Sequence, residues 1–328
     1  TAPAGIPKRY ILKSAKRARG LGQLTITISS LRQGFLICMG RRFQKGTEPI
    51  KGVKSYSHHQ ASLQFVVPLF NHLSMKGNER NRPDLFDLRD ILAAIGLLSR
   101  LPVRVDADHA MARAAFATWS YPIVGLVIGG LQATLAAMLI WLGVPVPLVA
   151  GLILAASMIV TGALHEDGLA DCADGFWGGY TIERRLEIMK DSQIGSYGTL
   201  ALIMSTGLRW GALWLALAAF GPLFLVATAA LSRVGMVALM YALPNARPSG
   251  LAASVGKPEP IHVGAAALIG IVVTVVFAPS PIMMMIAAGL VTCAVALIAM
   301  RKINGTTGDV LGATQQLTEI SLLIILAS

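Results

Sequence analysis

Long apolar stretches fill most of the chain after Trp119, and short polar or Gly- and Pro-containing segments separate them. A helix of about 20 apolar residues is long enough to cross the hydrocarbon core of a bilayer. Inside lipid, a helix also satisfies its own backbone hydrogen bonds. The pattern therefore predicts an all-α polytopic membrane protein with about six to seven transmembrane helices, near residues 119–142, 146–164, 198–220, 222–243, 262–279, 281–300 and, for a shorter seventh, 316–328.

A different pattern precedes these stretches. Apolar side chains recur at helical spacing in residues 85–103, at Leu85, Leu88, Ile91, Leu92, Ile95 and Leu98. Asp87, Arg89 and Asp90 fall between them. This spacing predicts an amphipathic helix that lies at the membrane surface and ends at Pro102.

The connecting segments alternate in charge. Those at 143–146, 221 and 279–280 carry no Lys or Arg, whereas those at 165–197, 244–261 and 301–315 carry several. Because basic loops stay on the cytoplasmic side of a membrane, the second set is predicted to be cytoplasmic, together with the N-terminal part. Every loop with candidate chemistry then lies on one face.

Composition supports the membrane assignment and locates the basic charge. Hydrophobic residues make up 54% of the chain and charged residues only 14%. The formal net charge is +11, but residues 1–80 hold 14 of the 28 Lys and Arg residues and only two acids. We expect residues 1–80 to be a basic, disordered extension and 81–328 to be the membrane-embedded domain. No nucleic-acid-binding motif accompanies the basic residues, so no nucleic-acid partner is expected.

The densest group of acids follows the second apolar stretch, at Glu166, Asp167, Asp171 and Asp174. On a helix, Asp167, Asp171 and Asp174 occupy positions i, i+4 and i+7 and share one face. Like charges this close need a counter-cation, and carboxylate oxygens suit Mg²⁺. The alternative is a solvated acidic loop, but no Lys or Arg interrupts residues 165–175. We therefore predict a Mg²⁺ site here.

His165 precedes these acids. It is a candidate general base, since its unperturbed pKa is about 6.5; the alternative is an interfacial side chain bonded to backbone. Lys190 and Asp191 belong to a second polar segment, and Lys190 is a candidate phosphate contact.

A third cluster, residues 304–313, is rich in glycine and contains Gly308 and Asp309. Glycines allow backbone N–H groups to approach an anion, and Asp309 is a candidate metal ligand. Arg209, Arg233 and Glu319 lie within or beside predicted spans, where an ionisable group faces a cavity or a partner. Arg233 is a candidate phosphate contact or partner of an acid. For Arg209 and Glu319, a structural ion pair and snorkelling are alternatives.

These clusters, in this order, resemble the cobalamin synthase family, adenosylcobinamide-GDP ribazoletransferase. The resemblance is carried by TGALHEDGLADCAD at 161–174, EIMKDSQIG at 187–195 and TGDVLGA at 307–313. Two shorter segments, LSRLPV at 98–103 and ARPSG at 246–250, also look like family segments. Together they cover about residue 85 to the end.

The resemblance implies a Mg²⁺-dependent reaction of small-molecule substrates. Adenosylcobinamide-GDP reacts with α-ribazole or its 5′-phosphate, giving adenosylcobalamin or its 5′-phosphate and GMP. Implied catalytic residues are His165, Asp174, Lys190 and Asp191, and implied substrate contacts are Arg233, Arg247 and Gly308. The implied metal ligands are Glu166, Asp167, Asp171, Asp174 and Asp309. The expected location is the inner membrane, in contact with lipid, with the active site facing the cytoplasm.

Two other functions use similar residues. A membrane phosphotransferase or prenyltransferase would use the same acids with a lipid acceptor. A cation transporter would also use carboxylates, but it would place them near the bilayer midplane. Here the acids gather at one end of the spans.

Overall fold

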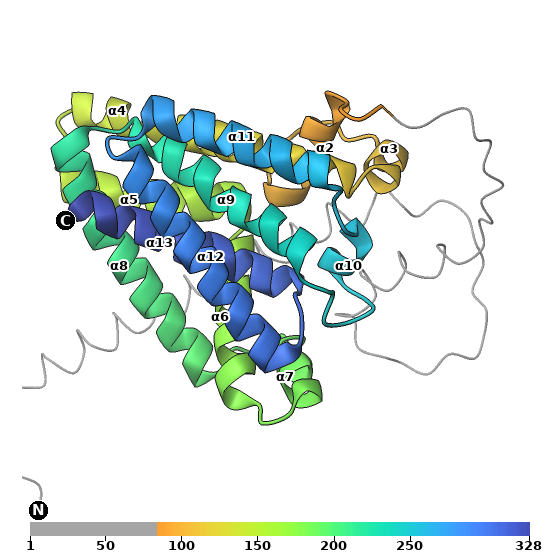
Figure 1. Cartoon of the computed structure of the whole chain (residues 1–328). Coiled ribbons are helices and arrows are strands. Elements are labelled where there is room, and N and C mark those ends of the chain that lie inside the picture. Colours follow the sequence, from red (N-terminus) through yellow and green to blue (C-terminus); the bar gives the residue numbers. More distant parts are fainter. Residues whose placement is uncertain (1–83) are drawn as a thin grey trace, which may run out of the picture. The chain divides into compact units, whose positions relative to one another are not determined.

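The computed structural model describes residues 84–328, and most of them are helical (Figure 1). Among these residues there is no β-strand, only one isolated bridge between Asn245 and Thr306. The helices are α2 (Arg89–Leu98), α3 (Ala107–Ala112), η2 (Phe116–Ser120), α4 (Tyr121–Trp141), α5 (Val146–Thr161), α6 (Leu164–Gly178), α7 (Ile182–Ile188), α8 (Ser196–Phe220), α9 (Phe224–Ala242), α10 (Leu251–Val255), α11 (Pro260–Phe277), α12 (Pro281–Ile303) and α13 (Gly308–Ala327). The all-α prediction is confirmed. The expectation for residues 1–80 lies outside the described residues.

Six of these helices are long and apolar enough to cross a membrane, and a seventh span results if the bent pair α5–α6 is counted as one. This agrees with the predicted six to seven. Most boundaries agree within three residues, and two of the differences affect the site. The second span ends at Thr161 rather than near 164, and the last helix begins at Gly308 rather than 316. Residues 308–313 are therefore the first turns of α13 and not a loop.

A bend of 89° separates α5 from α6. Gly162 and Ala163 both adopt left-handed backbone conformations, with φ of 65° and 55°. The N–H groups of these two residues bond to Ile159 and Met158 carbonyls, which closes the end of α5. The bend directs the acidic segment of α6 away from the line of the preceding span.

α9 and α13 form the centre of the helix assembly. In α9, 83% of the apolar segment is buried inside the protein, and in α13, 72% is buried. The corresponding share is only 22–39% in α4, α8, α11 and α12. These outer helices expose large apolar side chains, including Leu268, Val276, Ile282 and Leu290. Such an apolar exterior fits a lipid environment.

α4 packs closely along α9 because two glycines face it. A side chain at Gly125 would collide with the backbone of Ala229, and one at Gly129 would lie 2.5 Å from the Leu225 carbonyl oxygen. Their GxxxG spacing is typical of helices that approach closely in membranes.

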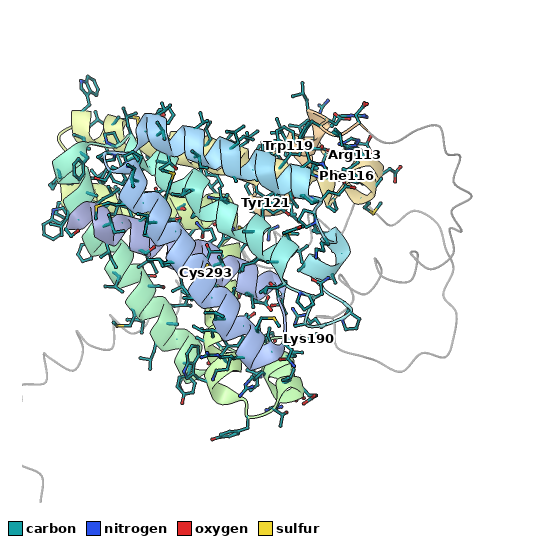
Figure 2. All side chains as sticks on the ribbon, in the orientation of Figure 1. Arg113, Phe116, Trp119, Tyr121, Lys190 and Cys293 are labelled. Carbon is teal, nitrogen blue, oxygen red and sulfur yellow. The ribbon has the colours of Figure 1, made fainter. Side chains whose placement is uncertain are left out.

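α2 is shorter than the predicted amphipathic helix of residues 85–103, since it begins at Arg89 and ends at Leu98. Asp90 is fully buried rather than on an outer polar face. Burial alone would raise the pKa of Asp90, but hydrogen bonds from Arg113 and Trp119 outweigh it and hold this pKa below its usual value. The Arg113 Nη2 lies 2.8 Å from the Asp90 carboxylate, and the Trp119 indole donates to it at 3.1 Å. Figure 2 labels these two partners of Asp90, Arg113 and Trp119, in the same part of the molecule. The paired guanidinium explains how an acid can occupy the buried face of α2.

Candidate active site

Two glycines bring the acidic helix α6 against the start of α13. A Cβ at Gly168 would lie 2.7 Å from the backbone oxygen of Asp309. A Cβ at Gly312 would lie 3.2 Å from the Cα of His165. The predicted clusters at 165–174 and 304–313 are therefore neighbours, although 129 residues separate them in sequence.

A cavity of about 90 Å³ lies between these helices, and we call it the acidic cavity. Five predicted site residues line it together: His165, Asp167, Arg247, Gly308 and Asp309. Apolar side chains such as Leu97, Met236 and Met240 complete its wall. Whole-ligand pockets usually measure about 300–1,000 Å³, so the acidic cavity has room for only part of a substrate.

Asp309 lies one residue inside the N-terminus of α13. Its Oδ2 is 3.1 Å from Arg247 Nη2 and accepts a hydrogen bond from the Thr307 hydroxyl at 3.2 Å. Thr307 also caps α13 by accepting the Val310 N–H. The other terminal nitrogen of Arg247, Nη1, is buried with no hydrogen-bond partner among residues 84–328.

This arrangement suits a phosphate group. The N-terminus of a helix attracts anions, and a guanidinium presents several donors in a fixed plane. The partnerless nitrogen of Arg247 is a donor that a phosphate oxygen would satisfy.

The carboxylates beside the acidic cavity do not form a complete metal site on their own. Within residues 84–328, no three His, Cys, Asp or Glu side chains converge closely enough to hold a metal. Mg²⁺, however, is usually held by one or two protein carboxylates, with water and substrate phosphates completing its shell. Asp167 is exposed and Asp309 is partly buried on the same cavity. Asp171, half-buried, lies one turn along α6 from Asp167.

Asp174 has a structural contact that sequence spacing did not indicate. Its two carboxylate oxygens accept the backbone N–H groups of Gly195 at 2.7 Å and Gly198 at 2.9 Å. Both glycines lie so close to this carboxylate that a side chain at either would collide with it. Asp174 therefore holds the start of α8, and its catalytic and metal-binding roles stay predictions.

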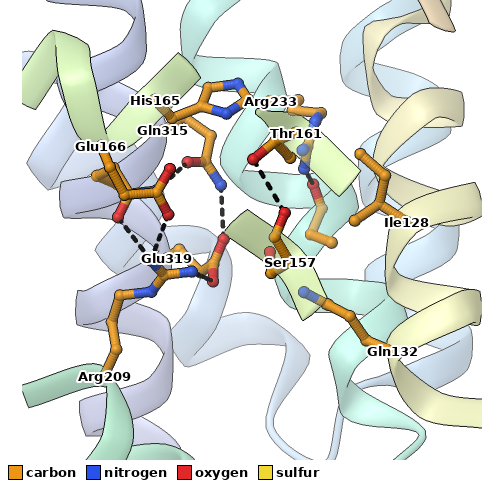
Figure 3. A pocket seen from close by; sticks show the side chains of 12 residues that line it. Ile128, Gln132, Ser157, Thr161, His165, Glu166, Arg209, Arg233, Gln315 and Glu319 are labelled. Atoms are coloured by element: carbon orange, nitrogen blue, oxygen red, sulfur yellow. Dashed lines mark hydrogen bonds and ion pairs between the residues drawn. The ribbon is translucent and has the colours of Figure 1, made fainter. Parts of the chain in front are cut away.

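Glu166 points to a different place from Asp167. Its Oε1 lies 2.8 Å from Arg209 Nη1, and Arg209 Nη2 lies 2.8 Å from Glu319. Gln315 donates to Glu319 at 2.6 Å, and Gln316 accepts from Arg209 at 2.9 Å (Figure 3). We call these five residues the buried polar cluster. It confirms the ion-pair alternative for Arg209 and Glu319, and it separates Glu166 from the acidic cavity.

Arg233 lies beside the buried polar cluster. Only 2% of its surface is exposed, and its Nη1 donates to the Ala229 carbonyl at 2.7 Å. The space between these side chains cannot hold a water molecule. The structure therefore does not bring Arg233 to the acidic cavity, whereas His165 borders both places.

Lys190 and Asp191 lie in the exposed turn that follows α7. Asp191 accepts the Gln193 N–H at 3.1 Å within this turn. Neither residue lines the acidic cavity. Their catalytic roles stay predictions that would require this turn to approach the substrate.

The sequence did not indicate what positions Arg247. Two backbone hydrogen bonds join its linker to the turn before α13, from Ala246 N–H to Thr306 at 2.9 Å and from Thr306 N–H to Pro244 at 2.8 Å. Gly305 packs directly on Pro244, with no space for a side chain. The only sequence signals are turn residues, at Pro244-Asn245 and Asn304-Gly305.

Comparison with known proteins gives a consistent result. The family model described as cobalamin-5-phosphate synthase matches residues 90–327. A protein of Bradyrhizobium diazoefficiens named adenosylcobinamide-GDP ribazoletransferase is 42% identical over 260 residues, which are 77% of this chain and 97% of that protein. Proteins of the same name from Sinorhizobium sp and Brucella canis are 44% and 40% identical, over 73% and 72% of this chain and 95% of each relative. No solved structure matches the chain.

Proposed function

This chain belongs to the cobalamin-5-phosphate synthase family, and we propose that the acidic cavity between α6 and α13 is the place where its transfer reaction occurs. The observation that carries this proposal is the meeting of Asp167, Asp309 and Arg247 at one cavity, because these residues match the charges of a diphosphate and its counter-cation.

The chain is an enzyme of the last step of cobalamin assembly. It transfers the adenosylcobinamide phosphate group from adenosylcobinamide-GDP to α-ribazole. A hydroxyl oxygen of the ribose forms a bond to the phosphorus attached to cobinamide. The bond from that phosphorus to the oxygen of GMP breaks, and GMP leaves while the hydroxyl loses its proton. This identity favours the transferase over a lipid-acceptor enzyme or a cation transporter.

Arg247 and the start of α13 would bind the diphosphate. The buried Arg247 nitrogen without a partner would donate to a phosphate oxygen, and backbone N–H groups around Gly308 would bind a second oxygen. These donors stabilise the negative charge that grows on the leaving phosphate. Preorganised donors of this kind supply much of the catalysis in phosphoryl transfer.

Asp167 and Asp309 would hold a Mg²⁺ ion, with Asp171 close enough along α6 to contribute. When bound, the ion neutralises negative charge on the diphosphate. Without a cation, carboxylates of these two helices would repel an anionic substrate. Their presence beside Arg247 therefore supports a metal-dependent reaction.

His165 is better placed than Asp174 to accept the proton of the ribose hydroxyl. His165 lines the acidic cavity, and its Nε2 has no hydrogen-bond partner among the described residues. Both oxygens of Asp174, in contrast, already accept backbone N–H groups. We assign the base to His165 on this ground.

The acidic cavity would face the cytoplasm from the inner membrane. Its charged residues come from α6, α13 and the 243–250 linker, which lie at the ends of the spans where the basic connections occur. Figure 1 shows α7 and α10 at the end of the helices away from the C-terminus. The positive-inside rule assigns that end to the cytoplasm.

The direct test uses membranes that contain the full chain, adenosylcobinamide-GDP, α-ribazole and Mg²⁺. We expect chromatography to find GMP and cobalamin in equal amounts, and neither product when α-ribazole is omitted. A chelator should stop the reaction, and added Mg²⁺ should restore it. GMP release without α-ribazole, together with a cobinamide-modified lipid, would contradict the assignment of the acceptor.

A further inference from the structure

A second cavity of about 380 Å³ lies at the same end of the helices. It is formed by the last turn of α9, the linker after it, α10 and Lys257. Its size falls in the range of about 300–1,000 Å³ that is usual for small-molecule sites. The acidic cavity, at about 90 Å³, is too small for a whole substrate. Binding of a whole small ligand therefore requires space outside the acidic cavity.

The two cavities are neighbours. Met240 and Ala252 line both of them. The linker between them carries Asn245 on the second cavity and Arg247 on the acidic cavity, only two residues apart. A ligand in the second cavity would thus lie beside a phosphate held by Arg247.

The wall between the cavities is held in place. The backbone of Pro244 and Ala246 is bonded to Thr306, immediately before the cap of α13. This fixes Asn245 relative to Asp309 without a ligand. A preorganised wall lowers the entropic cost of binding.

The lining of the second cavity combines apolar side chains with two polar ones. Met240, Leu243 and Pro244 provide apolar surface, Asn245 provides an amide and Lys257 provides a charge. The Lys257 ammonium lies 5.1 Å from the centre of the Tyr241 ring. Across residues 84–328 it has no salt bridge within 4.0 Å, so its charge is free to attract an anion.

We propose that the second cavity binds the acceptor nucleoside, with its base against Met240 and Leu243 and with any 5′-phosphate at Lys257. This inference rests on the transfer reaction described above. A flat, methylated benzimidazole base fits an apolar wall, whereas the corrin ring of the donor is far too large for the cavity. The ribose between base and phosphate would then face the acidic cavity, where its hydroxyl meets the cobinamide phosphate.

Lys257→Ala tests the phosphate contact. Initial rates would be measured in membranes with the full chain, varying in turn α-ribazole 5′-phosphate, α-ribazole and adenosylcobinamide-GDP. Because one charge-assisted contact is lost, we expect the KM for the phosphorylated acceptor to rise about tenfold. The KM values for α-ribazole and for the donor should stay within about twofold of those of the unaltered chain. Arg184→Ala, which removes a positive charge from the exposed face of α7, should change none of the three.

Ala242→Trp tests binding of the nucleoside itself, with or without its 5′-phosphate. Ala242 is an exposed residue on the cavity, so a larger side chain there fills the cavity without entering the helix core. We expect the KM for both acceptor forms to rise at least fivefold and the donor KM to stay unchanged. Unchanged acceptor KM values in both variants would overturn the proposal. A raised KM for the donor would also overturn the proposal, because it would indicate that the guanosine of the donor occupies this cavity. Continued release of GMP in either variant would leave the transfer reaction itself intact.

Discussion

Gly168 is the residue at which α6 and α13 approach most closely within the site. Its ideal Cβ would lie 2.7 Å from the backbone oxygen and 3.0 Å from the Cα of Asp309. A backbone cannot move aside as a flexible side chain can. Any side chain at position 168 must therefore push α13, and with it Asp309, away from Asp167.

We expect Gly168→Ala to reduce turnover at least tenfold and to destabilise the protein by about 1–3 kcal/mol, as overpacking usually does. Gly178→Ala in the same helix is the matched control, because its Cβ would lie 3.7 Å from Ile188 in ordinary contact. Turnover and melting temperature of both variants would be measured in detergent. Equal behaviour of the two variants would contradict the importance of this contact.

Sequence spacing predicted part of the site at the residue scale. It correctly placed Asp167, Asp171 and Asp174 on one helix, and it grouped Asp309 with them. Spacing could not show that Asp174 accepts two N–H groups from the start of α8, because that contact depends on the turn at 189–195. For the same reason it could not separate Glu166 from Asp167, which are adjacent in sequence, although Glu166 pairs with Arg209 and Asp167 lines the acidic cavity.

At the scale of elements, the buried polar cluster joins α6, α8 and α13. Arg209 on α8 pairs with Glu166 on α6 and with Glu319 on α13, and its side chain is only 2% exposed. Removal of one partner from a buried ion pair leaves an uncompensated charge, which typically costs about 3–5 kcal/mol. The cluster thus fixes α6, and the acids on it, against the two long helices.

Arg209→Gln should lower the melting temperature strongly, since two buried carboxylates lose their cation. Combining Arg209→Met with Glu166→Gln and Glu319→Gln removes all three charges, and we expect it to recover most of the lost stability. The exposed pair Arg184–Glu187 is the control, and Arg184→Ala should leave melting almost unchanged. If Arg209→Gln melted like the unaltered protein, this view of the cluster would be wrong.

Element lengths were less predictable than element types. Apolar length and spacing predicted the helices, but the sharp turn between α5 and α6 depends on two left-handed residues. Gly162 suggests such a turn, whereas Ala163 does not, since alanine rarely adopts this conformation. The start of α13 was also misplaced, because the glycines at 305, 308 and 312 resemble a loop when read alone. Gly312 is helical and instead allows contact with α6.

At the scale of the whole molecule, the proposed orientation can be tested by cysteine labelling. The background would carry alanine in place of the three native cysteines. In intact cells, a membrane-impermeant maleimide should label Ser280→Cys, in the loop between α11 and α12, but not Ser192→Cys, in the loop after α7. Opening the inner membrane should make Ser192→Cys reactive. Labelling of Ser192→Cys in intact cells would reverse the orientation.

The central claim is that the carboxylates of the acidic cavity hold the cation on which group transfer depends. Asp167→Asn keeps the shape of the side chain and removes one charge, so membrane insertion should survive. Turnover would be measured across a Mg²⁺ titration, beside Glu183→Gln, an exposed acid at the start of α7. We expect Asp167→Asn to lower the rate by about 10²–10³ and to require more Mg²⁺, and Glu183→Gln to change neither. Normal turnover and normal Mg²⁺ dependence of Asp167→Asn would contradict the account.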